Sequence, residues 1–315
     1  MAVPSNTAQT YALKGIREDL ADVIYNISPD ATPFLSKCKK VKASNTFTEW
    51  QTDALRSSAV NAHIEGDDTA ANAISPTVRL GNYTQIFKNA VIVSGTADAV
   101  DAAGRAKEMA YQVLKTSKEH KLDIEKALFD NQARAAGAAG TARRLAGAPA
   151  WIKTNVDMAT AGSPANPTGD GTDARTDGTA IAFSQARFNK VMQSVWEAGG
   201  DPDTVYLSSF QMNVALGFTG NNNQRNTVKK TEVAQLLDVY MTPWGQVQFV
   251  MSRENRSRDV FVMQSDKWHV ATLRATKNEP LAKTGDSEKR QIVTELTLIS
   301  ANEAASGIVA DNTVT

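Results

Sequence analysis

The sequence has little of what most enzymes and metal proteins need. Among its 315 residues there is one cysteine, Cys38, and three histidines, His63, His120 and His269. A single cysteine cannot form an intrachain disulfide, which fits a reducing compartment such as a cytoplasm. So few thiols and imidazoles argue against a zinc site. No Cys-His-Asn or Ser-His-Asp order has a recognisable local signature. We therefore expect no catalytic residue, no metal and no cofactor.

Net charge and long apolar runs are absent as well. The 34 basic residues balance 34 acidic ones, for a formal charge of +0. A protein that holds nucleic acid by its phosphates is normally basic. No run approaches the roughly 18 apolar residues of a membrane span, and the start lacks the apolar core of a signal peptide. Neither strong nucleic-acid binding nor a membrane partner is expected.

Three short motifs suggest functions that their details do not support. GAAGTARR (137–144) resembles a phosphate loop, but no lysine follows the second glycine and no strand precedes it, which favours a flexible connector. DGTDARTDG (170–178) is acidic, but its aspartates lack calcium-loop spacing and no distal glutamate follows, which favours a mobile surface loop. KCKKVK (37–42) could touch nucleic acid, but in a chain without net charge a solvated arm or an acidic protein neighbour is favoured.

The stretch REDLADVIYNISPDATPFLS (17–36) combines a helix signal with proline breaks. Its first half has apolar residues at the i, i+3, i+4, i+7 spacing of one helix face: Leu20, Val23, Ile24 and Ile27. Pro29 and Pro33 then push their preceding residues out of the helical region. We expect an apolar helix followed by an extended arm that presents Phe34 and Leu35.

Two strand-like segments, 41–53 and 77–95, flank a polar tract at 54–76. The tract consists largely of Ala, Ser, Asn and Asp, and it contains no Phe, Tyr or Trp. A connection of this length is unusual inside a compact domain. The pattern predicts a projecting β arm, and because an isolated two-stranded arm is marginal in water, something must cover it.

The longest predicted helix spans 105–132, which contains no Gly or Pro. Met109, Val113, Ile124 and Leu128 fall on one side, so the helix is expected to lie on a sheet as a spine about 40 Å long. Downstream the pattern alternates as in α/β proteins. The predicted elements are helices at 184–198, 210–218 and 231–240, strands at 204–209 and 245–253, a hairpin from VFVMQ (260–264) and WHVATLR (268–274), and a closing segment at 291–309.

Three stretches together resemble one family. Residues 17–36 and KASNTFTEWQTD (42–53) resemble the amino-terminal signature of a group of tailed-phage major head proteins. TELTLISANEAASGIV (294–309) resembles the closing strand and tail of the same group. The order between these ends is also similar, so the resemblance covers nearly the whole chain.

The resemblance implies an α+β chain with the Hong Kong 97-like capsid fold. Its parts would be an N-terminal arm (1–45), an extended loop (46–93), a peripheral domain with the spine helix (94–144), an axial domain (145–258), and return strands with a C-terminal tail (259–315). The implied function is a major capsid protein that forms pentamers and hexamers in an icosahedral shell around double-stranded DNA.

We expect an assembly interface from the arm and the loop, because an apolar arm and an uncovered β loop are liabilities in a monomer. In a shell, many such contacts must break at once. The candidate interface residues are Leu20, Val23, Ile24, Ile27, Phe34, Leu35, Phe47, Trp50, His63 and Ile64. The expected partners are other copies of the chain, a portal, a separate scaffolding protein, a cement protein, and DNA through weak non-specific contact.

Two departures and two alternatives accompany this interpretation. Some members of the fold cross-link through a lysine on the extended loop, but 54–76 contains none, so no autocatalytic cross-linking is expected. Some begin with a scaffolding segment, whereas this chain starts a few residues before the signature. The alternatives are an encapsulin-like nanocompartment shell around cargo enzymes, and an α/β hydrolase using 145–258, for which no catalytic constellation is present. The expected location is the virion capsid, assembled in the host bacterial cytoplasm.

Overall fold

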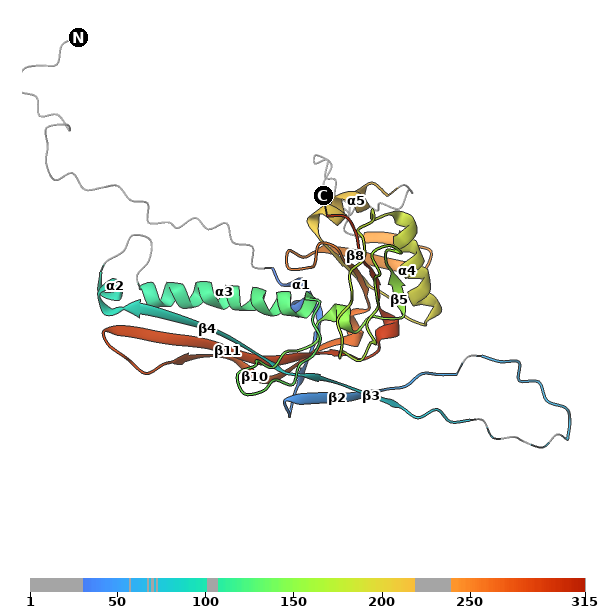
Figure 1. Cartoon of the computed structure of the whole chain (residues 1–315), viewed down its shortest axis with the longest axis horizontal. Coiled ribbons are helices and arrows are strands. Elements are labelled where there is room, and N and C mark those ends of the chain that lie inside the picture. Colours follow the sequence, from blue (N-terminus) through green and yellow to red (C-terminus); the bar gives the residue numbers. More distant parts are fainter. Residues whose placement is uncertain are drawn as a thin grey trace, which may run out of the picture.

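The computed structural model describes residues 31–56, 58–66, 68, 71, 73–100, 107–218 and 239–314. Figure 1 shows an elongated molecule with a long helix lying on a long sheet at one end and a compact α/β region at the other. A thin hairpin projects beyond the compact region, pointing away from the end that carries α2.

The elongated end contains a four-stranded sheet in the order β1-β10-β11-β4. Its strands are β1 (Lys39–Lys42), β10 (Trp268–Pro280), β11 (Ser287–Ser300) and β4 (Gln85–Ser94). β1 runs parallel to β10, and the other two pairings are antiparallel. The short helix α2 (Gly95–Ala99) follows β4, and the Ser94 hydroxyl caps its first turn.

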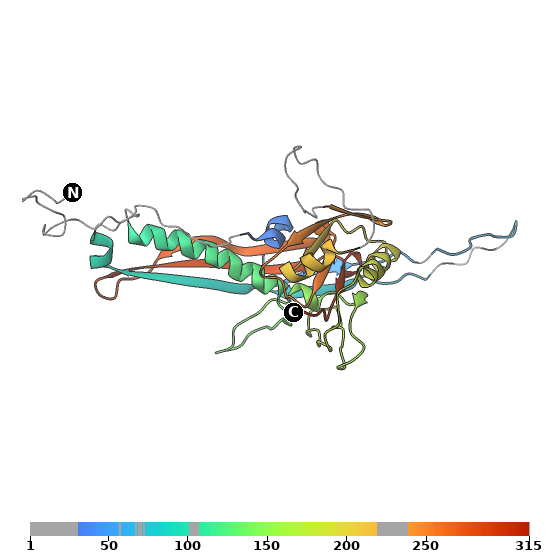
Figure 2. The same cartoon turned by 90° about the horizontal axis from the view of Figure 1, so that it is seen from above.

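The helix α3 (Glu108–Phe129) covers one face of this sheet, as seen from above in Figure 2. It buries residues at three- and four-residue spacing, which places them on one helix face. These are Met109, Thr116, His120, Ile124, Glu125, Leu128 and Phe129. Where the buried face becomes polar, strand residues supply partners: the two ring nitrogens of His120 lie 2.8 Å from the side-chain oxygens of Asn89 and Thr294.

The compact end contains a six-stranded sheet in the order β5-β12-β9-β6-β8-β7. The strands are β5 (Asn155–Asp157), β12 (Gly307–Val309), β9 (Val260–Met263), β6 (Thr204–Leu207), β8 (Gly245–Met251) and β7 (Val239–Thr242). Helices α4 (Gln185–Glu197) and α5 (Ser209–Leu216) pack beside it, each capped by the serine that precedes it. Short 3₁₀ helices occupy Ala148–Ala150, Ser265–Lys267 and Glu303–Ala305.

The projecting hairpin pairs β2 (Phe47–Thr52) with β3 (Val78–Tyr83) in an antiparallel two-stranded sheet. The residues between these strands that the structure describes have no helix or strand, and together they form a long open loop. We call the described part of 53–77 the loop.

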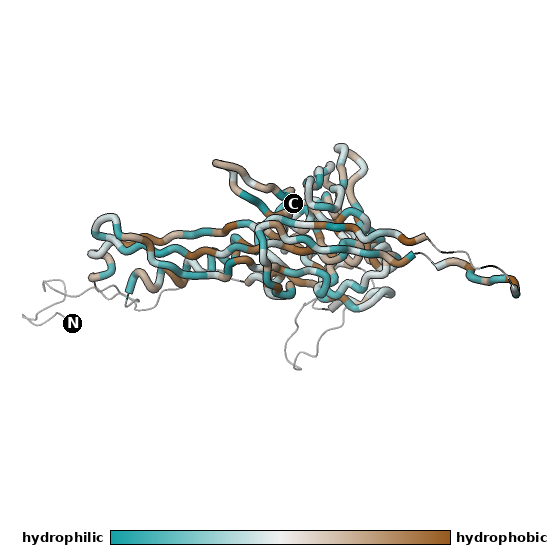
Figure 3. Tube along the Cα trace, turned by 90° about the horizontal axis from the view of Figure 1, so that it is seen from below, coloured by the Kyte–Doolittle hydropathy of each residue, from teal (hydrophilic) through white to brown (hydrophobic). Residues whose placement is uncertain are grey.

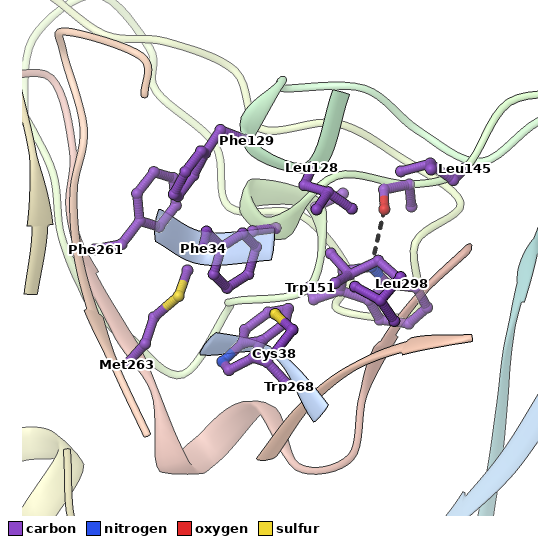
Figure 4. Close-up of a cluster of buried hydrophobic side chains, with 14 of the residues drawn as sticks. Phe34, Cys38, Leu128, Phe129, Leu145, Trp151, Phe261, Met263, Trp268 and Leu298 are labelled. Atoms are coloured by element: carbon purple, nitrogen blue, oxygen red, sulfur yellow. Dashed lines mark hydrogen bonds between the residues drawn. The ribbon is translucent and has the colours of Figure 1, made fainter. Parts of the chain in front are cut away.

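One hydrophobic core joins the two ends, as the close-up in Figure 4 shows. It receives Leu128 and Phe129 from the end of α3, Phe261 from the six-stranded sheet, and Trp268 from the four-stranded sheet. The short helix α1 (Pro33–Lys37) contributes Phe34 to the same core. Because both sheets share these contacts, the two ends form one continuous body.

Several predicted elements are confirmed. The spine helix is present as α3 and lies on a sheet, α4 and α5 match the helices predicted at 184–198 and 210–218, and β2 and β3 form the arm. The part of the predicted helix at 231–240 that precedes residue 239 lies outside the described residues. Its last two positions belong to strand β7, so the helix prediction is wrong there.

Other pairings differ from the prediction. Segment 41–53 contains two strands in different sheets, β1 and β2, separated by a turn at 43–46. β9 and β10 do not form a hairpin, because β9 pairs with β6 and β12 whereas β10 pairs with β1 and β11. The expected return of 259–315 to the spine-helix sheet holds only for β10 and β11, since β9 and β12 lie in the other sheet. β4 likewise belongs to the four-stranded sheet, so the projecting hairpin ends before Gln85 rather than near Val93.

Candidate assembly surface

The base of the projecting hairpin is fixed to its own subunit by aromatic contacts. The rings of Trp50 in the hairpin and Trp151 in the body lie 5.2 Å apart, and within the hairpin the cross-strand rings of Phe47 and Tyr83 lie 4.5 Å apart. The Arg134 guanidinium lies 5.3 Å from the Phe47 ring centre and donates a hydrogen bond to the Gly81 carbonyl. These contacts give the hairpin a defined direction where it leaves the body.

Buried polar side chains reinforce the same base. The Asn82 amide donates to the Leu298 carbonyl at 2.8 Å and accepts from the Ala146 amide at 2.9 Å. Arg143 donates to the Thr84 carbonyl at 2.7 Å and forms an ion pair with the buried carboxylate of Glu295. The connector expected at 137–144 is therefore anchored at Arg143, while residues 137–142 are exposed.

Beyond this base, the loop exposes large aliphatic side chains. Leu55 is 100% exposed, Val60 96%, Ile74 93% and Ile64 83%. Figure 3 shows apolar residues extending to the tip of the loop, among polar ones. Aliphatic side chains held this far from any core of their own gain free energy only when another surface covers them.

A buried carboxylate holds the N-terminal arm where its described part meets α3. Glu125 of α3 accepts hydrogen bonds from the backbone amides of Phe34 at 2.9 Å and Leu35 at 2.7 Å. These amides belong to the first turn of α1, which has no side-chain cap from its own N-cap residue. Burial is the main cause that raises the pKa of Glu125 to about 7, against the lowering effect of the two amides and Lys40.

The ten predicted interface residues fall into three groups. Leu20, Val23, Ile24 and Ile27 lie outside the described residues. His63 and Ile64 are exposed on the loop, as an intersubunit contact requires. Phe34, Leu35, Phe47 and Trp50 pack within their own subunit: Phe34 is 2% exposed in the shared core, and the other three are partly buried. A direct contact with a neighbouring subunit stays a prediction for the loop residues. Phe34 instead packs in the core of its own subunit.

Sequence reasoning missed the exposed Leu55, Val60 and Ile74, and also Glu125. The three aliphatic residues gave a usable signal, because each is isolated in a polar tract without helix or strand periodicity. Glu125 gave none, since a glutamate on a long helix is ordinarily solvated.

The groups considered for catalysis or metal binding do not converge. Burial raises the pKa of the Cys38 thiol to about 12, so the thiolate needed for nucleophilic chemistry is disfavoured despite nearby Lys40. His63, His120 and His269 lie on the loop, α3 and β10 respectively. Within the described part of the chain, no three His, Cys, Asp or Glu side chains form a possible metal site. In the segment at 170–178, Asp177 pairs with Arg256 at 2.6 Å.

None of the helices that the structure describes is long and apolar enough to cross a bilayer.

A spine helix on a sheet, a second α/β sheet and a projecting β loop together define the Hong Kong 97-like capsid fold, and solved capsid structures have this architecture. A cyanophage A-1(L) capsid asymmetric unit contains a chain that matches with a TM-score of 0.66 and 14% identity, over 99% of this chain and 100% of that one. A structure from Microbacterium phage Oxtober96 matches with a TM-score of 0.60 and 11% identity, over 94% and 96% of the two chains. At these identities the likeness establishes the fold.

Sequence comparison then establishes the family. The model of the SU10 major capsid protein family matches residues 3–313. The major capsid protein of Escherichia phage Phieco32 is 31% identical, over 95% of this chain and 95% of that relative. The chain belongs to the SU10 major capsid protein family, and it is the major capsid protein of a tailed phage. Its place is the virion capsid, which is built from many copies of it.

Proposed function

We propose that the chain forms pentamers and hexamers that close into an icosahedral shell around double-stranded DNA, and that the loop is the principal joint between neighbouring subunits. The observation that carries this proposal is the set of exposed aliphatic side chains on the loop. Each contributes about 1.5–3 kcal/mol if a neighbour buries it fully. The aromatic base fixes the direction of the loop, which reduces the entropy lost when it docks.

We also propose partners for this shell. A formal charge of +0 supports weak, non-specific contact with the packaged DNA, because strong phosphate binding would impede packaging and ejection. We propose that a separate scaffolding protein guides assembly in the host cytoplasm, that a portal occupies one vertex, and that a cement protein binds the outside. The role is structural, without a catalytic step. The family match to a phage capsid protein supports this function over the encapsulin-like alternative.

The test replaces the loop side chains Leu55, Val60, Ile64 and Ile74 together with serine. Since all four are exposed in the subunit, the free energy of unfolding should change by no more than about 0.5 kcal/mol per site. Negative-stain electron microscopy and light scattering should show that closed shells are lost while folded subunits remain.

The matched control keeps the same positions apolar, with Leu55→Met, Val60→Ile, Ile64→Val and Ile74→Val. This variant should assemble like the wild type. Shells of normal yield from the serine variant would refute the loop as the joint. Failure of the conservative variant would show that shape rather than burial governs the contact.

A further inference from the structure

One flank of the spine helix carries a shallow, partly apolar groove. Ala110, Leu114 and Ser117 recur at four- and three-residue spacing and so follow one side of α3. They face β10 and β11 across a groove of about 560 Å³, which Met109, Val113, Asn278, Glu288 and Arg290 also line. Leu114 is 63% exposed there. The opposite flank faces β4 instead, since Asp123 accepts a hydrogen bond from Asn89 of that strand at 3.1 Å.

The described N-terminal segment reaches α3 on this same flank. Glu125, which binds the Phe34 and Leu35 amides, lies eleven positions after Leu114, so it continues the same row of side chains. β1, which follows α1, pairs with β10, and this strand borders the groove. The residues before Phe34 therefore start on the same flank of α3 as the groove, eight helical residues or about 12 Å beyond its last α3 residue, Ser117.

We propose that residues 17–27 bind in this groove of their own chain as a helix, with the stripe Leu20, Val23, Ile24 and Ile27 against Leu114 and Val113. The distance permits it. Eleven helical residues separate Leu114 from Glu125 by about 17 Å. The seven residues from Ile27 to Phe34 span up to about 23 Å when extended, which the prolines at 29 and 33 favour.

Charge also favours this occupant. The predicted helix carries Asp19 and Asp22 beside its apolar stripe. Lys118 and Lys121 lie along the same flank of α3, between Leu114 and Glu125. An acidic, apolar helix therefore complements both the exposed Leu114 and the basic residues next to it.

The groove on the β4 side is the less suitable one. It is lined by Val91, Ile92, Val100, Glu108 and Gln112, and Ile92 is 61% exposed, so it is apolar too. To reach it from Glu125, however, the arm would have to cross over α3. This makes Ile92 a suitable control position, equal to Leu114 in exposure and on the other flank.

This assignment concerns the arm and does not depend on the loop being the intersubunit joint. The proposal for the loop and the proposal for the arm can fail separately. The loop is tested by whether the serine variant forms shells, and the arm by cross-linking within one chain.

The experiment places two cysteines in full-length chain that carries Cys38→Ala. Ile24→Cys is combined with Leu114→Cys, and the control combines Ile24→Cys with Glu119→Cys, which lies four residues before Asp123 and so on the β4 flank of the same helix. Equal amounts of ¹⁵N-labelled and unlabelled subunits are mixed, assembled, treated with a short thiol cross-linker and digested. Mass spectrometry then identifies the joined peptides and their labels.

We expect joined peptides from the Leu114 pair in at least fivefold excess over the Glu119 pair, with both peptides carrying the same label. If half of the joined peptide pairs carried one labelled and one unlabelled peptide, as random pairing between chains gives, the arm would bind a neighbouring copy and the own-chain assignment would be overturned. Equal or absent cross-linking in the two variants would overturn docking in this groove.

Hydrogen exchange provides a second measure that needs no cysteine. In the Cys38-containing chain, the amides of residues 17–27 should exchange at least tenfold more slowly than in an isolated peptide. Leu114→Ser should remove most of this protection, and Ile92→Ser should leave it intact. Equal effects of the two substitutions would refute the groove assignment.

Discussion

Replacing Phe34 with alanine should destabilise the folded subunit itself. The side chain is 2% exposed, and its ring centre lies 4.8 Å from Phe129, 5.4 Å from Tyr206 and 6.0 Å from Trp268. Removing a fully buried phenylalanine costs about 3–5 kcal/mol, because apolar contact is lost and a cavity remains. The backbone bonds of residues 34 and 35 to Glu125 do not involve the ring, so they should persist.

The assay is urea unfolding followed by tryptophan fluorescence, performed on subunits with the serine-substituted loop. Those subunits should stay unassembled, so protein concentration does not enter the measured stability. Leu35→Ala is the control on the same turn, and since Leu35 is only partly buried it should cost about 1 kcal/mol. A loss below 1 kcal/mol for Phe34→Ala, together with loss of shells in the wild-type loop background, would refute its place in the core.

Three further predictions concern pH, backbone packing and covalent chemistry. Because the pKa of Glu125 is raised to about 7, its favourable contribution is complete below its ordinary value near 4.5 and is lost as pH rises through 7. The free energy of unfolding of Glu125→Gln, measured with urea, should therefore rise by about 3 kcal/mol relative to that of the wild type between pH 4.5 and pH 8. A difference between the two proteins that does not change with pH would contradict this. Gly147→Ala should cost about 1–3 kcal/mol, because the new Cβ would lie 2.0 Å from the Asp130 carbonyl oxygen, whereas Gly140→Ala, with open space but a φ of +86°, should cost about 1 kcal/mol. Boiling purified shells in SDS should yield monomer-sized bands, since 54–76 contains no lysine, and a covalent ladder would disprove this.

Local signals in the sequence predicted the long elements well. The stretch 105–132 has no helix breaker, and its apolar spacing placed Met109, Ile124 and Leu128 correctly on the buried face of α3. The polar tract at 54–76 between two strand signals predicted the projecting hairpin. In both cases neighbours in sequence determine the structure, so a single sequence contains the necessary information.

Long-range pairing could not be predicted in the same way. VFVM (260–263) and WHVATLR (268–274) are adjacent strands, but the turn at Ser265–Lys267 directs them into different sheets. A signal was available, because VFVM is an uninterrupted apolar run of the kind found in interior strands of covered sheets, and all four residues of β9 are indeed buried. The site showed the same limit: proline spacing favoured an extended arm, whereas Pro33 begins the short helix α1, whose amides Glu125 binds from ninety residues away.

The position of β12 affects how the chain folds during synthesis. This strand, Gly307–Val309, lies between β5 and β9, so it completes the interior of a sheet whose other strands begin at residue 155. The six-stranded sheet remains divided until the ribosome has made residue 309. A nascent chain whose loop has already emerged therefore lacks the finished body against which a neighbour could dock. We therefore expect the strand order in this sheet to delay association of subunits until residue 309 has been synthesised, and so to limit aggregation between chains on the same polysome.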